Sequence, residues 1–128
     1  MGAGLTAVRV GSSVLHVAMG EARAGAAVRV QLLARDVILA TSRPENISVR
    51  NVLTGTVSRV VGDDPDTDLV YVDIGGAQVL SRVTRVASDA LSLHPGTHVW
   101  VLVKAVSIRG HAFVHGAPTD AAGRRLTY

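Results

Sequence analysis

The sequence predicts an all-β fold, arranged as a small barrel or sandwich. Apolar residues alternate with polar ones along most of the 128-residue chain, which is the period of a strand that buries one face. The apolar runs are short, and turn residues separate them at close intervals, as in small antiparallel domains. Hydrophobic residues make up 48% of the chain, which argues against a disordered protein.

Strands in the first half follow from the spacing of valine and leucine. Residues 8–17 carry valines on both sides of Gly11–Ser13, which predicts a hairpin with a short turn. Residues 28–39 are expected to form one half-buried strand over the whole stretch. Residues 52–61 predict another strand, broken at Gly55 because glycine weakens a strand interior.

The second half continues the pattern with one exception. Residues 70–83 predict a hairpin that turns at Gly75–Gly76. Residues 86–93 have helical spacing, and Pro95–Gly96 ends that segment. Residues 99–103 are expected to form the last strand, because three valines alternate there with larger apolar residues.

Two segments of the chain repeat. Residues 25–37 match residues 96–108 at a constant offset of 71 positions, and the two expected hairpins match at an offset of 64. The repeat predicts an incomplete first module over residues 1–46, a second module over residues 47–108 and a C-terminal tail over residues 109–128.

The two modules are unequal at their starts. The second module has the strand 52–61 ahead of its hairpin, whereas only four residues precede Leu5 in the first. A small barrel that lacks one strand exposes an unpaired edge. We therefore expect the chain to be a fragment of a longer protein, or a partner to supply the strand.

The composition and motifs argue against several classes of protein. Without cysteine, the chain can form no disulfide and no cysteine-ligated metal site. Its apolar runs are too short to span a membrane, and no secretory signal opens it, so we expect a cytoplasmic domain. It has neither a phosphate loop nor a nucleophile elbow, so we expect no catalytic residues. With a net charge of +3 and scattered arginines, nucleic-acid binding is only a minor alternative.

Two clusters resemble metal sites superficially. His111 and His115 are four residues apart, which suits metal binding only on a helix, and here they flank an expected strand or tail. The run Asp63–Asp68 lacks the glycine and the closing glutamate of a calcium loop. We expect an edge pair of histidines and a solvated hairpin tip, and no metal site.

A pocket for a small anion agrees better with the residue types present than a metal site or a nucleic-acid surface does. A small dianion needs converging hydroxyl and backbone N–H donors with one or two cations. The candidates are the segment Ser48–Asn51, Thr84 and Lys104, which is the only lysine among 13 basic residues. Each also has a structural explanation that needs no ligand. Ser48 could cap a turn, Thr84 could be an ordinary β-branched strand residue, and Lys104 could extend from a barrel edge to solvent.

Three blocks of sequence resemble a known family. The segment Ile47–Val57 is similar to the SARN-x-L-x-G-x-V opening of the Mop/TOBE family, which are small molybdate-binding domains of OB-like fold. Val83–Thr84 with Ala90–Gly96 resembles the middle of that family, and Val101–Ala105 resembles its ALIKA strand. The segment Ala34–Glu45 resembles the C-terminal domain of ATP-binding subunits of molybdate ABC transporters. The resemblance implies two OB-like barrel modules with one short helix, the first truncated at its N-terminus.

The resemblance also implies a ligand and its donors. The ligand would be molybdate or tungstate, with no organic cofactor. The donors carried over are hydroxyls, backbone N–H groups and cationic side chains, from Ser48, Val49, Arg50, Thr84, Ser88, Lys104 and Ala105. The family usually has serine three residues after the threonine, where this chain has Ala87. Three outcomes are open: weaker binding, use of Ser88 through a local shift, or loss of the ligand. Losing one such donor costs about 1–3 kcal/mol.

The implied context is a transporter. The resemblance implies a homodimer attached to an ATPase domain and to membrane permease subunits, which senses cytoplasmic oxyanion and restrains transport. A ligand-free structural dimerisation module is the alternative, with a single-stranded nucleic-acid binder behind it. In the first module Leu33 stands at the position of Lys104 (33 + 71 = 104), so we expect no equivalent pocket there.

Overall fold

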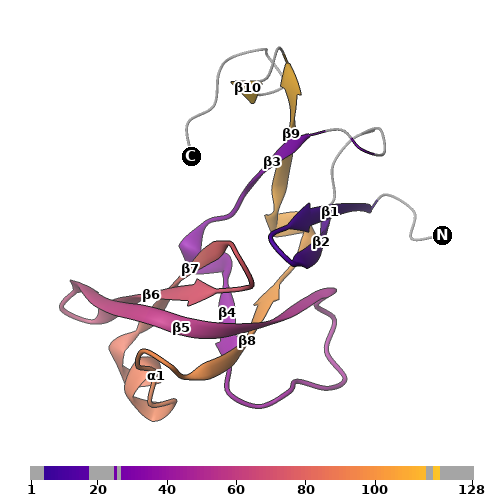
Figure 1. Ribbon diagram of the computed structural model, residues 1–128. Coiled ribbons are helices and arrows are strands. Elements are labelled where there is room, and N and C mark those ends of the chain that lie inside the picture. Colours follow the sequence, from indigo (N-terminus) through magenta and orange to yellow (C-terminus); the bar gives the residue numbers. More distant parts are fainter. Residues whose placement is uncertain (1–4, 18–24, 26, 115–116, 119–128) are drawn as a thin grey trace.

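The computed structural model describes residues 5–17, 25, 27–114 and 117–118 (Figure 1). These residues form antiparallel strands, one six-residue α-helix and two short 3-10 helices. The strands lie in a five-stranded, a three-stranded and a two-stranded sheet. The prediction of an all-β fold with one short helix is therefore confirmed.

The first half of the chain departs from the prediction at one point. Its elements are β1 (Thr6–Val10), β2 (Ser13–Val17), β3 (Val28–Gln31), η1 (Ala34–Asp36) and β4 (Ile38–Ala40). The expected hairpin is present, but the single strand predicted over residues 28–39 is wrong. The Asp36 N–H donates to the Leu33 carbonyl at 2.9 Å, which closes η1 and directs β4 into a different sheet from β3.

The second half contains the long strand of the fold. Its elements are β5 (Asn51–Asp64), β6 (Thr67–Asp73), β7 (Gln78–Thr84), α1 (Arg85–Ala90) and β8 (His98–Val103). The expected break at Gly55 is wrong, because β5 runs through it. Glycine is required there for packing instead, since a Cβ atom would lie 2.5 Å from Val72 Cγ1 and 3.0 Å from the Asp73 carbonyl oxygen.

Further elements follow the segment expected to hold the last strand. They are η2 (Ala105–Ser107), β9 (Arg109–Val114) and β10 (Ala117–Pro118). Residues 109–114 are thus a strand, within the segment predicted as a C-terminal tail. The strand forms because β9 pairs with β3, so that Arg109 lies opposite Gln31 and Ala112 opposite Val28.

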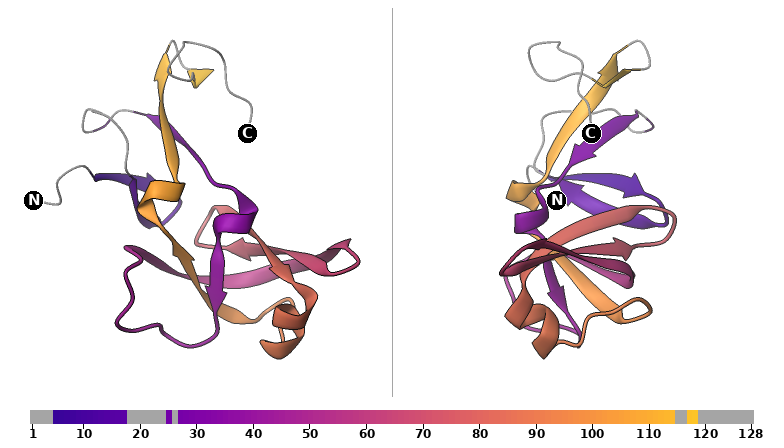
Figure 2. Two further views of the ribbon diagram at one scale, coloured as in Figure 1. Left: turned by 180° about the vertical axis from the view of Figure 1, so that it is seen from behind. Right: turned by 90° about the vertical axis from the view of Figure 1, so that its left-hand side faces the viewer.

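The halves exchange strands. The five-stranded sheet has the order β4-β8-β5-β6-β7, so it contains one strand from the first half, while β9 of the second half pairs with β3. Figure 2 shows the connections β3-η1-β4 and β8-η2-β9 running along each other in opposite directions. The two 3-10 helices follow the 71-residue offset of the sequence repeat, because η1 (Ala34–Asp36) and η2 (Ala105–Ser107) lie 71 positions apart.

The five-stranded sheet curls, and a buried side chain ties its two ends. The Ser81 hydroxyl in β7 is fully buried and donates to the Val37 carbonyl oxygen, just before β4, at 2.6 Å. The inward faces of the strands supply a core rich in valine, which includes Val57, Val70, Val72, Val101 and Val103. This closure gives the five-stranded sheet, with β4 from the first half, the shape of a small OB-like barrel.

Two contacts hold the first hairpin against the second half. At the turns, the Ser12 N–H donates to the Gly75 carbonyl oxygen at 2.7 Å, and the Ser13 hydroxyl donates to the Ile74 carbonyl oxygen at 2.9 Å. At the start of β5, the buried Asn51 amide accepts from the His16 N–H at 2.7 Å and donates to the His16 carbonyl oxygen at 2.9 Å. The Asn51 amide thus makes the two hydrogen bonds to the His16 backbone that a neighbouring strand would otherwise make with β2.

Candidate functional site

The structure brings two of the predicted donor groups together at the start of β5. Asn51 lies opposite Val103 in the ladder, which places Arg50 next to Lys104 just outside it. The loop before β5 turns at Asn46, whose φ of 56° is a conformation that asparagine tolerates well. We call this end, formed by Ser48–Arg50 and Lys104–Ala105, the basic end of β5.

The basic end offers donors suited to a small anion. Ser48, Arg50 and Lys104 are exposed, so a hydroxyl and two cationic groups face solvent. Lys104 is the N-cap of η2, and the Ala105 N–H lies in the first turn, where a helix has no internal acceptor. Val49 is half-buried and apolar, so only its backbone N–H could serve an anion.

The other predicted donors lie at the far end of β5. Thr84 pairs with Thr67, and Thr67 pairs with Asp64, the last residue of β5. The Thr84 hydroxyl oxygen accepts from the Ala87 N–H at 3.1 Å and caps α1, which leaves its own hydrogen available to donate. Ser88 is 4% exposed, so Thr84 is the accessible hydroxyl at this end.

One chain therefore does not bring all seven predicted residues together. β5 has 14 residues, and its two ends lie on the order of 40 Å apart along the strand. Figure 1 shows α1 and the β5–β6 turn at one side of the molecule and the loop before β5 at the other. A compact site containing both sets needs donors from two copies of the chain.

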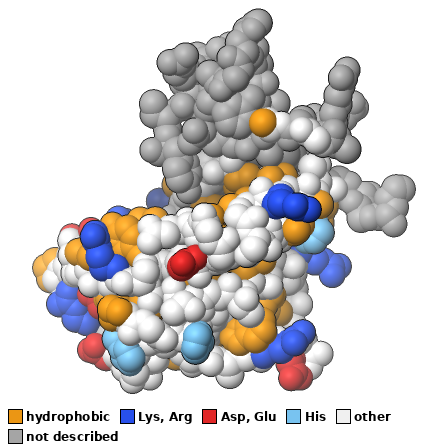
Figure 3. Space-filling view, in the orientation of Figure 1, with side chains coloured by type: hydrophobic (Ala, Val, Ile, Leu, Met, Phe, Trp, Pro, Cys, Tyr) orange, Lys and Arg blue, Asp and Glu red, His pale blue; other side chains and the backbone are white. Residues whose placement is uncertain are grey.

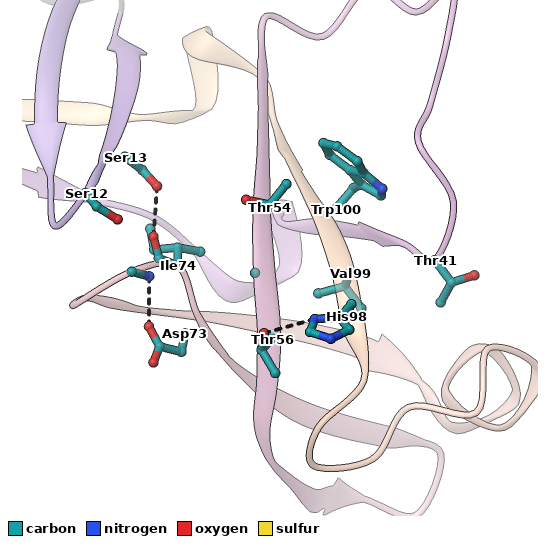
Figure 4. Close-up of a pocket in the computed structure, with 12 residues that line it drawn as sticks. Ser12, Ser13, Thr41, Thr54, Thr56, Asp73, Ile74, His98, Val99 and Trp100 are labelled. Atoms are coloured by element: carbon teal, nitrogen blue, oxygen red, sulfur yellow. Dashed lines mark hydrogen bonds between the residues drawn. The ribbon is translucent and has the colours of Figure 1, made fainter.

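A groove that the sequence analysis missed lies beside the middle of β5. Its volume is about 560 Å³ (Figure 4). Hydroxyl groups dominate the lining, which consists of Ser12, Ser13, Thr41, Thr54, Gly55, Thr56, Asp73, Ile74, Gly75, His98, Val99 and Trp100. No sequence motif signals it, because hairpin turns and strands distant in the chain form it together.

The chemistry of this groove does not favour a dianion. The lining contains no lysine or arginine, and Asp73 adds negative charge. One Asp73 carboxylate oxygen accepts from the Gly75 N–H at 2.8 Å, so this side chain serves the turn. Thr56 Oγ1 and His98 Nδ1 lie 3.3 Å apart, so these two polar groups of the lining already bond to each other.

The metal-like clusters can now be placed. Asp63–Asp68 spans the turn between β5 and β6, as expected for a hairpin tip. His111 lies in β9, while His115 lies outside the described residues. Within the described part of the chain, no group of three or more histidine, aspartate or glutamate residues could hold a metal ion.

Among the residues that the structure describes, no helix is both long and apolar enough to cross a membrane.

Two aromatic side chains of the strands each have an arginine over the ring. The guanidinium of Arg43 lies 5.5 Å from the centre of the Trp100 ring, and that of Arg59 lies 4.5 Å from the centre of the Tyr71 ring. Such cation–π pairs occupy a face on which a base would stack. On the face seen in Figure 3, basic side chains are separated and form no continuous stripe.

Comparisons with known proteins give matches over most of this chain. The model of the TOBE domain matches residues 47–110, which is 64 of the 128 residues. The molybdenum import ATP-binding protein ModC of Rhizobium meliloti is 42% identical over 81% of this chain and 29% of its own length. ModC of Rhizobium etli is 35% identical over 83% of this chain and 30% of its own length. The chain thus spans about 30% of the length of these relatives.

A solved structure gives the same result for the fold. The cytoplasmic molybdate-binding protein ModG, in a crystal form with molybdate bound, superposes with a TM-score of 0.61 and 30% sequence identity. The match covers 65% of this chain and 60% of that one. Since the family model covers half of the residues and the β architecture is that of an OB-like barrel, the chain belongs to the TOBE domain family.

Proposed function

We propose that this chain is a cytoplasmic regulatory domain of the ATPase subunit of a molybdate ABC importer, and that it binds molybdate or tungstate. The relatives named ModC and the molybdate-bound ModG structure support this ligand class. The domain senses the oxyanion and restrains transport when loaded. Its role is binding, without catalysis and without an organic cofactor.

The observation that carries the proposal is the charge and donor content of the basic end. The single lysine of the chain stands opposite Arg50 just beyond the ladder, and the exposed Ser48 lies two residues before Arg50 in the chain. An ammonium group, a hydroxyl and backbone N–H groups together match the charge and the acceptor oxygens of a tetrahedral dianion.

The proposed site is completed by a second copy of the chain. Ser48, Val49, Arg50, Lys104 and Ala105 of one copy face Thr84 of the other, with Ser88 joining through a local shift. In a dimer with two-fold symmetry, each β5 strand contributes its basic end to one site and its far end to the other. The homodimer therefore holds two equivalent oxyanion sites.

Calorimetry with molybdate, tungstate and sulfate tests the ligand. We expect molybdate and tungstate to bind the folded dimer and sulfate to bind more weakly, with pocket size as the source of selectivity because the three anions carry the same charge. Lys104→Ala removes a charge-assisted hydrogen bond and should weaken molybdate binding by roughly ten- to a hundredfold. Arg35→Ala, an exposed arginine in η1, is the matched control and should leave affinity unchanged. Absence of heat at millimolar molybdate would refute the ligand assignment.

A ligand-free structural dimerisation module is the second candidate. The observation in its favour is that the far end presents Ala87 where the family has serine, while Ser88 is buried. A thermal-shift series separates the two functions. A structural module should unfold at the same temperature with and without molybdate, whereas ligand binding raises that temperature by mass action.

A further inference from the structure

One buried hydroxyl group beside the far end of β5 has no hydrogen-bond partner. Among the residues that the structure describes, Thr67 Oγ1 is the only side-chain nitrogen or oxygen atom that is buried without one. Burying a hydroxyl group without a hydrogen bond is unfavourable, so folded proteins rarely leave one in this state. The function proposed above does not use Thr67, so the unpartnered group calls for an explanation of its own.

Thr67 lies directly beside the proposed donor Thr84. The two residues are opposite each other in the β6–β7 ladder. The neighbouring pair is hydrogen-bonded, because the Arg85 N–H donates to the Asp66 carbonyl oxygen at 2.8 Å. Bonded and non-bonded pairs alternate along an antiparallel ladder, so Thr67 and Thr84 form a non-bonded pair, in which the two Cα atoms approach to about 4.5 Å. The two side chains share one face of the sheet, and their hydroxyl groups are neighbours.

Arg85 holds the backbone around Thr67 in place. Its guanidinium donates to the Thr67 carbonyl oxygen at 3.4 Å and to the Asp64 carbonyl oxygen at 3.2 Å. The same guanidinium pairs with the Asp68 carboxylate at 3.2 Å, and only 11% of the Asp68 side chain is exposed. The unpartnered hydroxyl group is therefore not the result of a loose turn. With its backbone fixed, Thr67 can reach a partner by rotation of its side chain about the Cα–Cβ bond.

Thr84 has room for one more hydrogen-bond donor. Its Oγ1 atom accepts from the Ala87 N–H at 3.1 Å. A threonine hydroxyl group has one donor hydrogen and two acceptor positions. In the proposed site the Thr84 hydrogen is donated to the oxyanion, so one acceptor position on Thr84 Oγ1 stays open. The Thr67 hydroxyl group is a neighbouring donor that can fill this position.

We infer that Thr67 is a positioning residue for the oxyanion, whose hydroxyl group donates to Thr84 Oγ1 while Thr84 donates to the bound anion. The inference rests on the proposed function, in which Thr84 contacts the anion. Both hydroxyl groups then have partners, and the bond from Thr67 polarises the Thr84 hydroxyl group and strengthens its bond to the anion. Thr84 gains this strength without help from Ser88, which is buried in α1.

Thr67→Val tests the inference, because valine has the shape of threonine without the hydroxyl group. Without molybdate, the variant should unfold at the wild-type temperature or above it, since the lost hydroxyl group had no partner. Its affinity for molybdate, measured by calorimetry, should fall by roughly three- to tenfold, as expected for one lost hydrogen bond. Thr67→Ser keeps the hydroxyl group and should retain an affinity within about twofold of the wild type.

A double-mutant cycle with Thr84→Val shows whether Thr67 acts through Thr84. In a chain that already carries Thr84→Val, Thr67→Val should change the affinity by less than about twofold. Thr54→Val, at an exposed threonine in the middle of β5, is the matched control and should change neither the affinity nor the unfolding temperature. All unfolding temperatures are compared at one protein concentration, and circular dichroism checks that each variant is folded.

Two results overturn the inference alone, provided that the wild type binds molybdate. A lower unfolding temperature for ligand-free Thr67→Val would mean that the hydroxyl group is already bonded, for example to an internal water molecule. Wild-type affinity in Thr67→Val, or the same loss with and without Thr84→Val, would mean that Thr67 does not act through Thr84. A wild-type chain that gives no heat at millimolar molybdate refutes the proposed function, and the inference with it.

Discussion

Gly11→Ala tests the contact between the two hairpin turns. Gly11 has a φ of 60°, and a Cβ atom there would collide with the Gly75 carbonyl oxygen and lie 3.2 Å from the Ala77 nitrogen. Both obstacles are backbone atoms, so a rotamer change cannot relieve them. The turn must move, and the 2.7 Å bond from the Ser12 N–H to Gly75 is lost with it.

The control for this substitution lies in the same contact. Gly76 has a φ of 90°, and the nearest atom to an added Cβ, Gly11 Cα, is 4.0 Å away. Gly76→Ala should therefore cost only the backbone strain of a left-handed conformation, about 1–2 kcal/mol. Gly11→Ala adds overpacking, about 1–3 kcal/mol, and a broken hydrogen bond, about 1 kcal/mol.

Urea unfolding at one fixed protein concentration measures both variants. We expect Gly11→Ala to lower the free energy of unfolding by about 2–4 kcal/mol more than Gly76→Ala does, with the same m-value. Equal losses would refute the reasoning, because they would mean that the turns do not touch. A loss confined to Gly76→Ala would mean that strain in the second turn alone governs stability.

Three further predictions follow from single contacts. Ser81→Ala removes the buried bond that closes the barrel and should cost about 1–2 kcal/mol in thermal unfolding, whereas a negligible loss would contradict the closure. Arg85→Ala leaves the nearly buried Asp68 carboxylate unpaired and should cost about 1–3 kcal/mol, more than Arg82→Ala, whose ion pair is more exposed; the reverse order in denaturant titrations would contradict this. Thr84→Val removes the cap of α1 and should cost about 1 kcal/mol, and it should also weaken molybdate binding, while Thr84→Ser should preserve both; calorimetry and thermal unfolding check the pair.

The strands were predictable where each one buries a single face. Alternating valines identified both hairpins, because a period of two depends only on which face is buried. The break at η1 was not predictable in this way, since a turn held by backbone bonds leaves no gap in the apolar pattern. β9 was missed for a related reason, because it is stabilised by pairing with β3, which is about 80 residues earlier in the chain.

The candidate site was predictable only in part. The resemblance supplied the seven residues, and the pairing of Asn51 with Val103 explains why Arg50 and Lys104 meet. The distance between Lys104 and Thr84 was not readable from the sequence, because it depends on how far β5 runs before it turns. The partners of the acidic residues were equally hidden, since Asp68 and Arg85 meet only through the register of β6 on β7.

The exchange of β4 and β9 has a consequence for synthesis on the ribosome. β3 and β4 emerge early, but their pairing partners β9 and β8 emerge some 60 to 80 residues later. Until then the nascent chain carries strand edges that have nothing to pair with, a state prone to aggregation. The first half cannot complete its fold as an independent unit, because β4 must wait for β8 and β3 must wait for β9, on the far side of the second 3-10 helix.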